Sequence, residues 1–233
     1  MNDPNELLGL IRKLQESPPE AAPLWLAKRR LAAALRRVND VLCDSQASPE
    51  AVDALAERLA EGAEVLASSG SQQRSDGSAP AAVPAAAVPG MENFIDRGPI
   101  AGLSNPIAPP ASLGIDLDAQ RVVGEVTFGK AFEGAPGCVH GGFVAAVLDE
   151  ALGMACVFAG GPAMTAELTT RYLRHTPIEM PLKIEAKLDG VEGRKVRTSG
   201  RVTTCGPCVH PPPRDALRSS ASSRSGCGGG SGS

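Results

Sequence analysis

Aromatic side chains are scarce in this sequence, at 3% of its 233 residues. Proteins that bind single-stranded nucleic acid stack the bases on aromatic rings, so this scarcity argues against that class. The formal net charge of −3 also argues against general nucleic-acid binding, which requires a concentrated basic face. We therefore expect no nucleic-acid partner.

Long apolar runs, a signal-peptide pattern and a regular cysteine framework are also lacking. No run approaches the roughly 20 apolar residues of a membrane span, and the N-terminus shows no signal pattern. We therefore expect a cytoplasmic protein without a membrane partner. The six cysteines are irregularly spaced in a long chain, which does not suggest a disulfide framework.

Composition divides the chain into a helical extension, a flexible linker, a globular domain and a disordered tail, at residues 1–68, 69–90, 91–204 and 205–233. The extension carries three amphipathic patterns. We expect helices from about Pro4, from Pro23 to Leu42 and from Pro49 onward, because apolar residues recur there at helical spacing. The three helices would form a small bundle or add to the surface of a partner.

Residues 137–150 form a glycine-rich loop that becomes an apolar helical pattern. We expect a mostly buried helix from about Gly141 to Val157, because the run is rich in alanine and leucine and lacks proline. The first backbone N–H groups of a helix have no internal partner, and here they follow His140. An oxygen that gains negative charge would be stabilised at that point. Asp149 lies farther along, in apolar surroundings where a carboxylate is costly unless it is paired or used.

Strand candidates precede and follow this helix, at Ser112–Leu117, Val122–Phe128, Ala163–Leu173, Leu182–Leu188 and Lys195–Thr203. Residues 118–120 fit a turn between the first two, and Asp189-Gly190 fits the connection between the last two. A long helix with strands before and after it predicts an α+β fold, in which an antiparallel sheet wraps around one helix.

Three motifs in this region stand at informative spacing: His140-Gly141-Gly142 with an acid nine positions after the histidine, Met164-Thr165-Ala166-Glu167-Leu168 followed by Tyr172 and Pro177, and Gly193-Arg194-Lys195. Together they resemble the hotdog-fold acyl-CoA thioesterases, specifically the PaaI-like group of the phenylacetic acid pathway. The resemblance implies a hotdog fold, an acyl-CoA substrate, no cofactor or metal, and homodimers or homotetramers with active sites at the protomer interface.

The resemblance also implies roles for individual residues. Asp149 would be the general base or the nucleophile, and Thr165 would position the water. The backbone N–H of Gly141 or Gly142 would polarise the thioester carbonyl, which agrees with the donors expected at a helix start. For His140 two roles stay open, namely orienting the loop or transferring a proton. The basic residues Arg194, Lys195 and Arg174 would bind coenzyme A phosphates or are ordinary surface charges.

Two departures from the family pattern bear on function. Many relatives have a polar side chain before the histidine that helps to hold the carbonyl, and Glu133 is the only candidate here. An alternating strand should follow Thr204, but a proline-rich segment stands there, so the sheet would lack its last strand and present an unpaired edge. The alternative function is therefore a non-catalytic acyl-CoA-binding or protein-interaction hotdog protein. Cys205-Gly206-Pro207-Cys208 spells a redox tetrapeptide but lacks the helix start that this chemistry needs.

Overall fold

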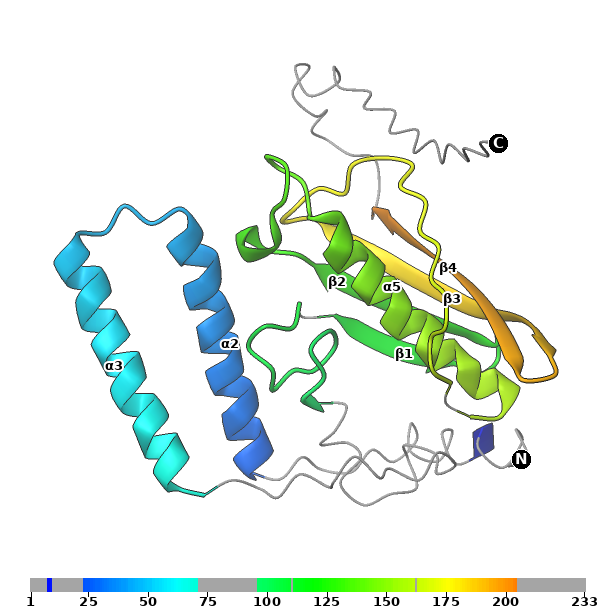
Figure 1. Cartoon of the computed structure of the whole chain (residues 1–233), viewed down its shortest axis with the longest axis horizontal. Coiled ribbons are helices and arrows are strands. Elements are labelled where there is room, and N and C mark those ends of the chain that lie inside the picture. The colour runs from blue at the N-terminus through cyan, green and yellow to red at the C-terminus, as the bar shows by residue number, and fades with distance from the viewer. Residues whose placement is uncertain (1–7, 10–22, 71–95, 110, 162, 205–233) are drawn as a thin grey trace, which may run out of the picture.

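The computed structural model describes residues 8–9, 23–70, 96–109, 111–161 and 163–204 (Figure 1). Its elements are α2 (Pro23–Cys43), α3 (Pro49–Ser68), β1 (Ser112–Asp116), β2 (Arg121–Thr127), the 3₁₀ turn η2 (Lys130–Phe132), α5 (Gly141–Ala155), the 3₁₀ turn η3 (Cys156–Ala159), β3 (Pro181–Glu192) and β4 (Lys195–Thr204). The expected tail, most of the expected linker and most of the first expected helix lie outside the described residues.

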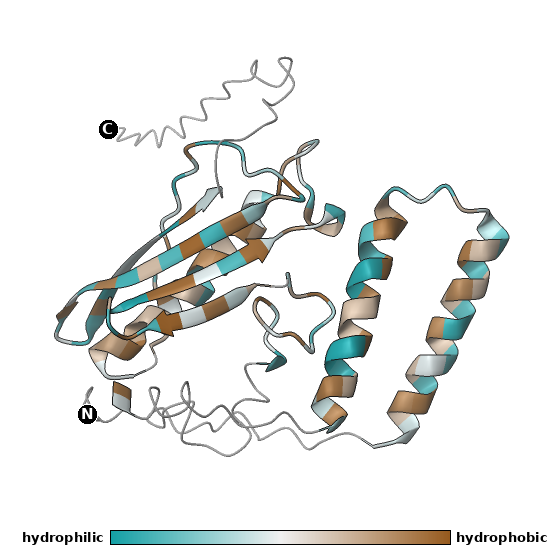
Figure 2. Cartoon of the chain, turned by 180° about the vertical axis from the view of Figure 1, so that it is seen from behind, coloured by the Kyte–Doolittle hydropathy of each residue, from teal (hydrophilic) through white to brown (hydrophobic). Residues whose placement is uncertain are grey.

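The four strands form one antiparallel sheet in the order β1-β2-β3-β4. Successive side chains alternate between the two faces of this sheet, as the hydropathy colours of the strands show (Figure 2). On β3, for example, Leu182, Ile184 and Ala186 are buried, whereas the residues between them are exposed or half-buried. On the outer face, Glu185 forms ion pairs with Arg121 and Arg201 from the two neighbouring strands. One face of the sheet is therefore left to pack against a helix.

Helix α5 covers that face (Figure 1). Its buried residues, Val144, Val147, Ala151 and Ala155, recur at helical spacing and join the strand residues in one hydrophobic core. The helix ends two residues before the predicted end, and the chain continues as η3. By length and composition alone, the 19 residues of Gly141–Ala159 are apolar enough to cross a membrane, contrary to the sequence expectation. In this fold the same stretch is the helix that packs on the sheet.

Two expectations about strands are wrong. No strand forms at Ala163–Leu173, and this segment instead runs irregularly beside α5 (Figure 1). A strand needs hydrogen bonds from a neighbouring strand, and within the described residues neither edge strand, β1 or β4, pairs with this segment. Asp189-Gly190 lies inside β3 at a register shift rather than in the connection. The turn is made at Gly193, whose φ of 60° suits a residue without a side chain.

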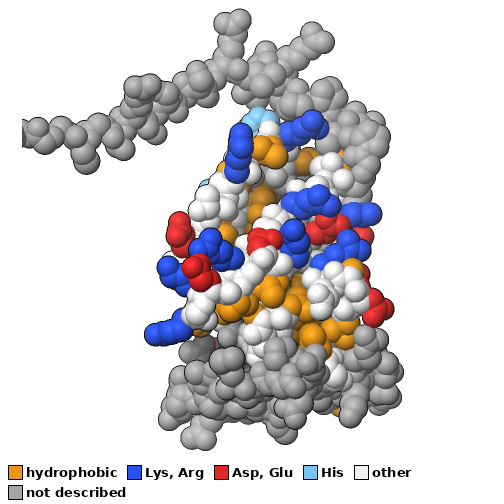
Figure 3. Space-filling model, turned by 90° about the vertical axis from the view of Figure 1, so that its right-hand side faces the viewer, with side chains coloured by type: hydrophobic (Ala, Val, Ile, Leu, Met, Phe, Trp, Pro, Cys, Tyr) orange, Lys and Arg blue, Asp and Glu red, His pale blue; other side chains and the backbone are white. Residues whose placement is uncertain are grey.

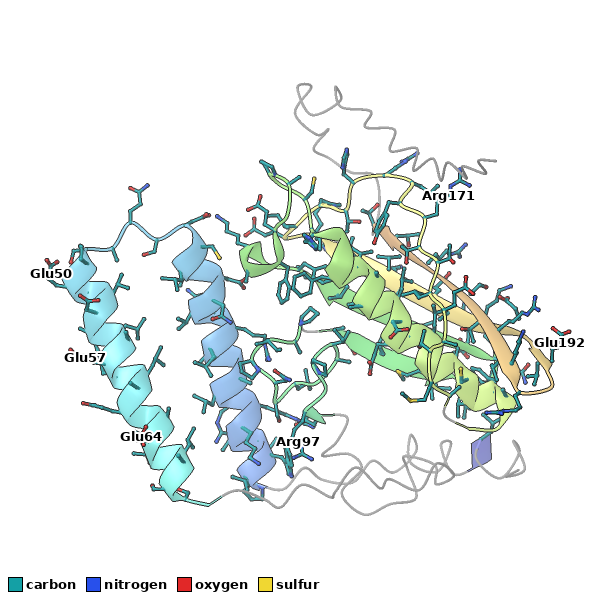
Figure 4. The ribbon with its side chains drawn as sticks, viewed as in Figure 1. Glu50, Glu57, Glu64, Arg97, Arg171 and Glu192 are labelled. Carbon is teal, nitrogen blue, oxygen red and sulfur yellow. The ribbon has the colours of Figure 1, made fainter. Side chains whose placement is uncertain are left out.

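Helices α2 and α3 confirm the second and third helices expected in the N-terminal extension. Ser48 caps α3, because its hydroxyl accepts a hydrogen bond from the Ala51 N–H at 3.4 Å. Ala32 is the buried residue of α2, and α3 buries none. Three α3 carboxylates, those of Glu50, Glu57 and Glu64, point away from α2 (Figure 4). The two helices on their own therefore enclose no bundle core.

Helix α2 is instead attached to the globular domain by polar contacts. Arg29 forms an ion pair with the buried Asp96, with 2.9 Å between Nε and Oδ1. About two turns later, Arg36 donates hydrogen bonds to the backbone carbonyls of Leu103 and Asn105, at 3.2 and 2.8 Å. Because arginine presents several donors in a fixed geometry, these contacts set the position of α2 along the 96–109 segment.

The C-terminal half of α2 holds the η2 turn. Asp40 Oδ1 accepts a hydrogen bond from the Ala131 N–H at 3.1 Å, and Lys130 forms an ion pair with Asp44. The Asp40 carboxylate also occupies the place of a side chain on Gly129, since a Cβ there would lie 2.4 Å from its oxygen. Only glycine therefore fits at residue 129 while the aspartate is in this position.

Candidate functional site

The loop that leads into α5 is closed by hydrogen bonds of its own. The Glu133 carboxylate accepts a hydrogen bond from the Gly137 N–H, and the Gly134 N–H donates to the Cys138 carbonyl at 2.9 Å. The His140 N–H donates to the Phe132 carbonyl at 2.9 Å, which ties the end of the loop to η2. The structure thus places Glu133, the candidate carbonyl-holding side chain, in a bond that shapes the loop.

His140 is the N-cap of α5. Its Nδ1 accepts a hydrogen bond from the Gly142 N–H at 3.1 Å, and its carbonyl accepts one from the Phe143 N–H at 3.0 Å. Because Nδ1 is the acceptor, a neutral ring carries its proton on Nε2. Of the first three N–H groups of the helix, that of Gly141 alone makes no hydrogen bond within the described residues. Between the two glycines that the sequence left open, the free donor is therefore Gly141.

A cavity of about 270 Å³ adjoins this donor. Its walls come from the glycine-rich loop, from the start of α5 and from residues 172–176. Tyr172 lies against Gly141 and donates a hydrogen bond from its hydroxyl to the Gly141 carbonyl at 2.8 Å. Sequence reasoning assigned no role to Tyr172, because only the fold brings it to residue 141. Its signals in the sequence were its place in the second of the three motifs and the fact that it is the single tyrosine of the chain.

Asp149 and Thr165 lie together on the side of α5 that faces away from the sheet. The Thr165 hydroxyl donates a hydrogen bond to Asp149 Oδ1 at 2.8 Å, although 16 positions separate the two residues. Asp149 is half-buried and Thr165 is exposed. The expectation that the acid is buried in apolar surroundings is therefore wrong, because the buried side chains of α5 face the sheet and Asp149 points away from them.

The next residue along the helix, Glu150, has a carboxyl group with a raised pKa. Burial raises the pKa of the Glu150 carboxyl above its ordinary value, and the negative charge of Asp149 raises it further. Glu150 is half-buried and makes no hydrogen bond or ion pair with the described residues. Periodicity pointed to Asp149 alone, so sequence reasoning missed this second acid.

The free N–H of Gly141 and the Asp149–Thr165 pair are separated along the helix axis. Residue 149 lies eight positions after residue 141, which corresponds to about 12 Å at 1.5 Å per residue. Asp149 is also not among the residues that line the cavity beside Gly141. Within one protomer, a single carbonyl group therefore cannot touch both.

The predicted basic residues lie at different ends of the domain. Arg174 lines the cavity near the start of α5, whereas Arg194 and Lys195 belong to the β3–β4 turn. Their sequence neighbours Arg171 and Glu192 mark these two places in Figure 4. Figure 3 shows Lys and Arg side chains spread over this side of the molecule, with carboxylates between them. The structure therefore does not gather the three residues into one cluster within a protomer.

Nothing in the described part of the chain gathers three metal-ligating side chains. Cys138 is half-buried in the loop before α5 and is a free thiol. The tetrapeptide at 205–208 lies outside the described residues.

Known proteins resemble this chain in both sequence and fold. Residues 136–206 match the Thioesterase superfamily. Acyl-coenzyme A thioesterase THEM4 of Xenopus laevis is 39% identical over 74 residues, which are 32% of this chain and 33% of that protein. Acyl-coenzyme A thioesterase THEM5 of Homo sapiens is 32% identical over 71 residues, or 30% and 29% of the two chains. The chain thus spans about a third of the length of the curated relatives that it matches.

A solved structure gives a longer match. The crystal structure of a thioesterase superfamily protein aligns with 34% identity and a TM-score of 0.65, covering 81% of this chain and 90% of that one. This coverage exceeds what residues 91–204 supply, so the alignment extends beyond the globular domain. The match agrees with the observed fold, a four-stranded antiparallel sheet packed on one central helix, which is the hotdog arrangement. On this similarity, the chain belongs to the thioesterase superfamily.

Proposed function

We propose that this protein hydrolyses acyl-CoA thioesters to a free acid and coenzyme A. The observation that carries the proposal is one helix that presents a free N–H at Gly141 and a hydroxyl-bonded carboxylate at Asp149. Thioester hydrolysis needs these two groups, a donor where the oxyanion develops and a base beside the water. The relatives named acyl-coenzyme A thioesterase support the substrate class.

In the proposed reaction, the thioester carbonyl oxygen accepts the hydrogen bond of the Gly141 N–H. Thr165 gives its proton to the bond with Asp149, so its oxygen lone pairs remain to hold a water molecule. Asp149 removes a proton from that water as the water oxygen attacks the carbonyl carbon. The tetrahedral intermediate then collapses, the C–S bond breaks, and coenzyme A leaves as a thiolate that takes up a proton. Direct attack by Asp149 is the other route and forms a mixed anhydride with release of the coenzyme A thiolate. In a single turnover in ¹⁸O-water, the Asp149 carboxylate is labelled only if water opens this anhydride at the Asp149 carbonyl carbon.

We propose further that each site is shared by two copies of the chain. The separation of about 12 Å between the donor and the acid is too long for one carbonyl group. Two α5 helices that pack antiparallel about a two-fold axis would bring Gly141 of one copy to Asp149 of the other. The same axis would bring Arg194 and Lys195 of one copy toward Arg174 of the other. Together these basic residues would bind the negatively charged phosphates of coenzyme A.

The first experiment measures thiol release from short, long and aromatic acyl-CoAs by the full chain. We expect Asp149→Asn to lower kcat at least about a hundredfold, the usual contribution of a positioned base. Asp53→Asn is the matched control, because Asp53 lies exposed on α3. Binding of acyl-CoA without turnover in the unmodified chain would refute hydrolysis and would favour the non-catalytic alternative.

A complementation experiment tests the shared site. Gly141→Pro removes the N–H donor at the first helical position, where proline suits the helix backbone, and its ring also displaces Tyr172 slightly. Neither Gly141→Pro nor Asp149→Asn should be active alone. When the two are refolded together, half of the dimers are mixed and each mixed dimer holds one intact site, so about a quarter of wild-type activity should return. Failure to regain activity, with mixed dimers demonstrated by mass spectrometry, would contradict the shared site.

A further inference from the structure

The peptide group between Gly141 and Gly142 is held at both ends by side chains. The Tyr172 hydroxyl donates a hydrogen bond to its carbonyl oxygen at 2.8 Å. His140 Nδ1 accepts a hydrogen bond from its N–H at 3.1 Å. Neither glycine has a side chain to restrict its own backbone torsions, so the direction of the neighbouring N–H groups depends on such external contacts.

The ring of Tyr172 also covers one side of Gly141. A Cβ at residue 141 would lie 3.2 to 3.3 Å from ring and hydroxyl atoms of Tyr172, tighter than nearly all real contacts of this kind. Tyr172 reaches this place because the segment that carries it is bonded to the glycine-rich loop. The Val139 N–H donates to the Thr176 carbonyl at 2.8 Å, and the Ile178 N–H donates to the Gly137 carbonyl at 3.2 Å.

We propose that Tyr172 is a positioning residue that keeps the Gly141 N–H directed toward the thioester carbonyl, an inference that rests on the proposed hydrolysis. By fixing the carbonyl end of the Gly141–Gly142 peptide group, the hydroxyl prevents this group from rotating. The Gly141 N–H belongs to the preceding His140–Gly141 peptide group, and the Gly141 torsions join the two groups. Holding the second group limits rotation about these torsions and keeps the Gly141 N–H aimed at the cavity that it borders. A donor fixed in advance stabilises the oxyanion, which develops in the transition state and is absent from the bound substrate, so the effect falls on kcat rather than on KM.

Two variants separate the hydroxyl from the ring. Tyr172→Phe keeps the ring against Gly141 and removes only the hydrogen bond. We expect it to lower kcat about tenfold, the rate equivalent of one hydrogen bond, with KM changed less than about twofold and the unfolding midpoint retained. Tyr172→Leu, which loses both, should lower kcat further. Thr169→Val, on the same segment, is the matched control. Wild-type kcat in Tyr172→Phe would overturn the inference.

Two further readouts use fluorinated tyrosine and amide hydrogen exchange, and the exchange does not depend on activity. Because Tyr172 is the single tyrosine of the chain, biosynthetic incorporation of fluorotyrosine labels this position alone. More acidic fluorinated phenols donate stronger hydrogen bonds, so kcat should rise with their acidity. In Tyr172→Phe, the amide hydrogen of Gly142 should exchange faster with solvent, measured by NMR. Unchanged exchange would overturn the positioning role, whereas an unmodified chain that hydrolyses no acyl-CoA would overturn the proposed function alone.

Discussion

The hydrogen bond between Thr165 and Asp149 gives the sharpest test of the proposed chemistry. Thr165→Val keeps the shape of the side chain and removes the hydroxyl that donates to Asp149 Oδ1 at 2.8 Å. A hydrogen bond to an ionised carboxylate contributes about 1.5–3 kcal/mol. Thr165 is exposed and Asp149 only half-buried, so solvent competition reduces this to about 1 kcal/mol. We therefore expect kcat for acyl-CoA hydrolysis to fall about fivefold from misorientation of the carboxylate, and further if the water loses its second partner.

The assay is steady-state thiol release at saturating acyl-CoA, with the unfolding midpoint measured on the same preparations. Thr165→Ser restores a hydroxyl on the same atom and should return most of the activity. Thr169→Val removes a hydroxyl four positions along the same segment and should leave kcat within about twofold of wild type. If Thr165→Val kept full kcat while Asp149→Asn was inactive, the acid would act without its threonine, and the assigned water site would be wrong.

Three further predictions concern stability. Burial raises the pKa of Glu150 in the folded chain, so folding favours the protonated form of this carboxyl group. The stability that this group contributes should therefore fall as the pH rises above 4.5, the ordinary pKa of the carboxyl. In thermal melting, Glu150→Gln should be more stable than the wild type at pH 7 but not at pH 4. Gly153→Ala adds a Cβ that meets nothing within 4 Å, so denaturant titration should show a gain of about 1 kcal/mol, whereas a loss would mean that another surface covers this side of α5. Asp40→Ala removes the acceptor for the Ala131 N–H and should cost about 1 kcal/mol, with faster hydrogen exchange at Ala131. Unchanged exchange at Ala131 would show that α2 does not hold the η2 turn.

Much of the fold follows from local patterns in the sequence. Helical spacing in α2, α3 and α5 and alternation in the four strands each depend on residues close in the chain, and these elements were predicted within a few positions. The strand prediction at 163–173 was wrong because it, too, used only a local pattern. Its alternation is local, but a strand also needs a neighbour, and no residue within the segment determines whether one is present.

The candidate site was predictable in its parts but not in its geometry. The His140-Gly141-Gly142 motif located the start of α5, and spacing located Asp149. The sequence did not show that His140 engages the Gly142 N–H and leaves the Gly141 N–H free, because this depends on a side-chain torsion. Nor did it show that Tyr172, far along the chain, lies on Gly141. The half-buried state of Asp149 also escaped, since helical spacing indicates which residues share a face but not what covers that face.

The contact between Asp40 and Gly129 links two parts of the chain that belong to different modules. In the folded protein, the Asp40 carboxylate occupies the space that the Cβ of any larger residue at 129 would need. Alanine at 129 would therefore require the Asp40 carboxylate to move: a relative with alanine at the position of Gly129 should have either a shorter side chain at the position of Asp40 or an aspartate in another torsion. A relative that kept both alanine and aspartate would lose this arrangement, because its carboxylate could not occupy the place that it takes beside Gly129.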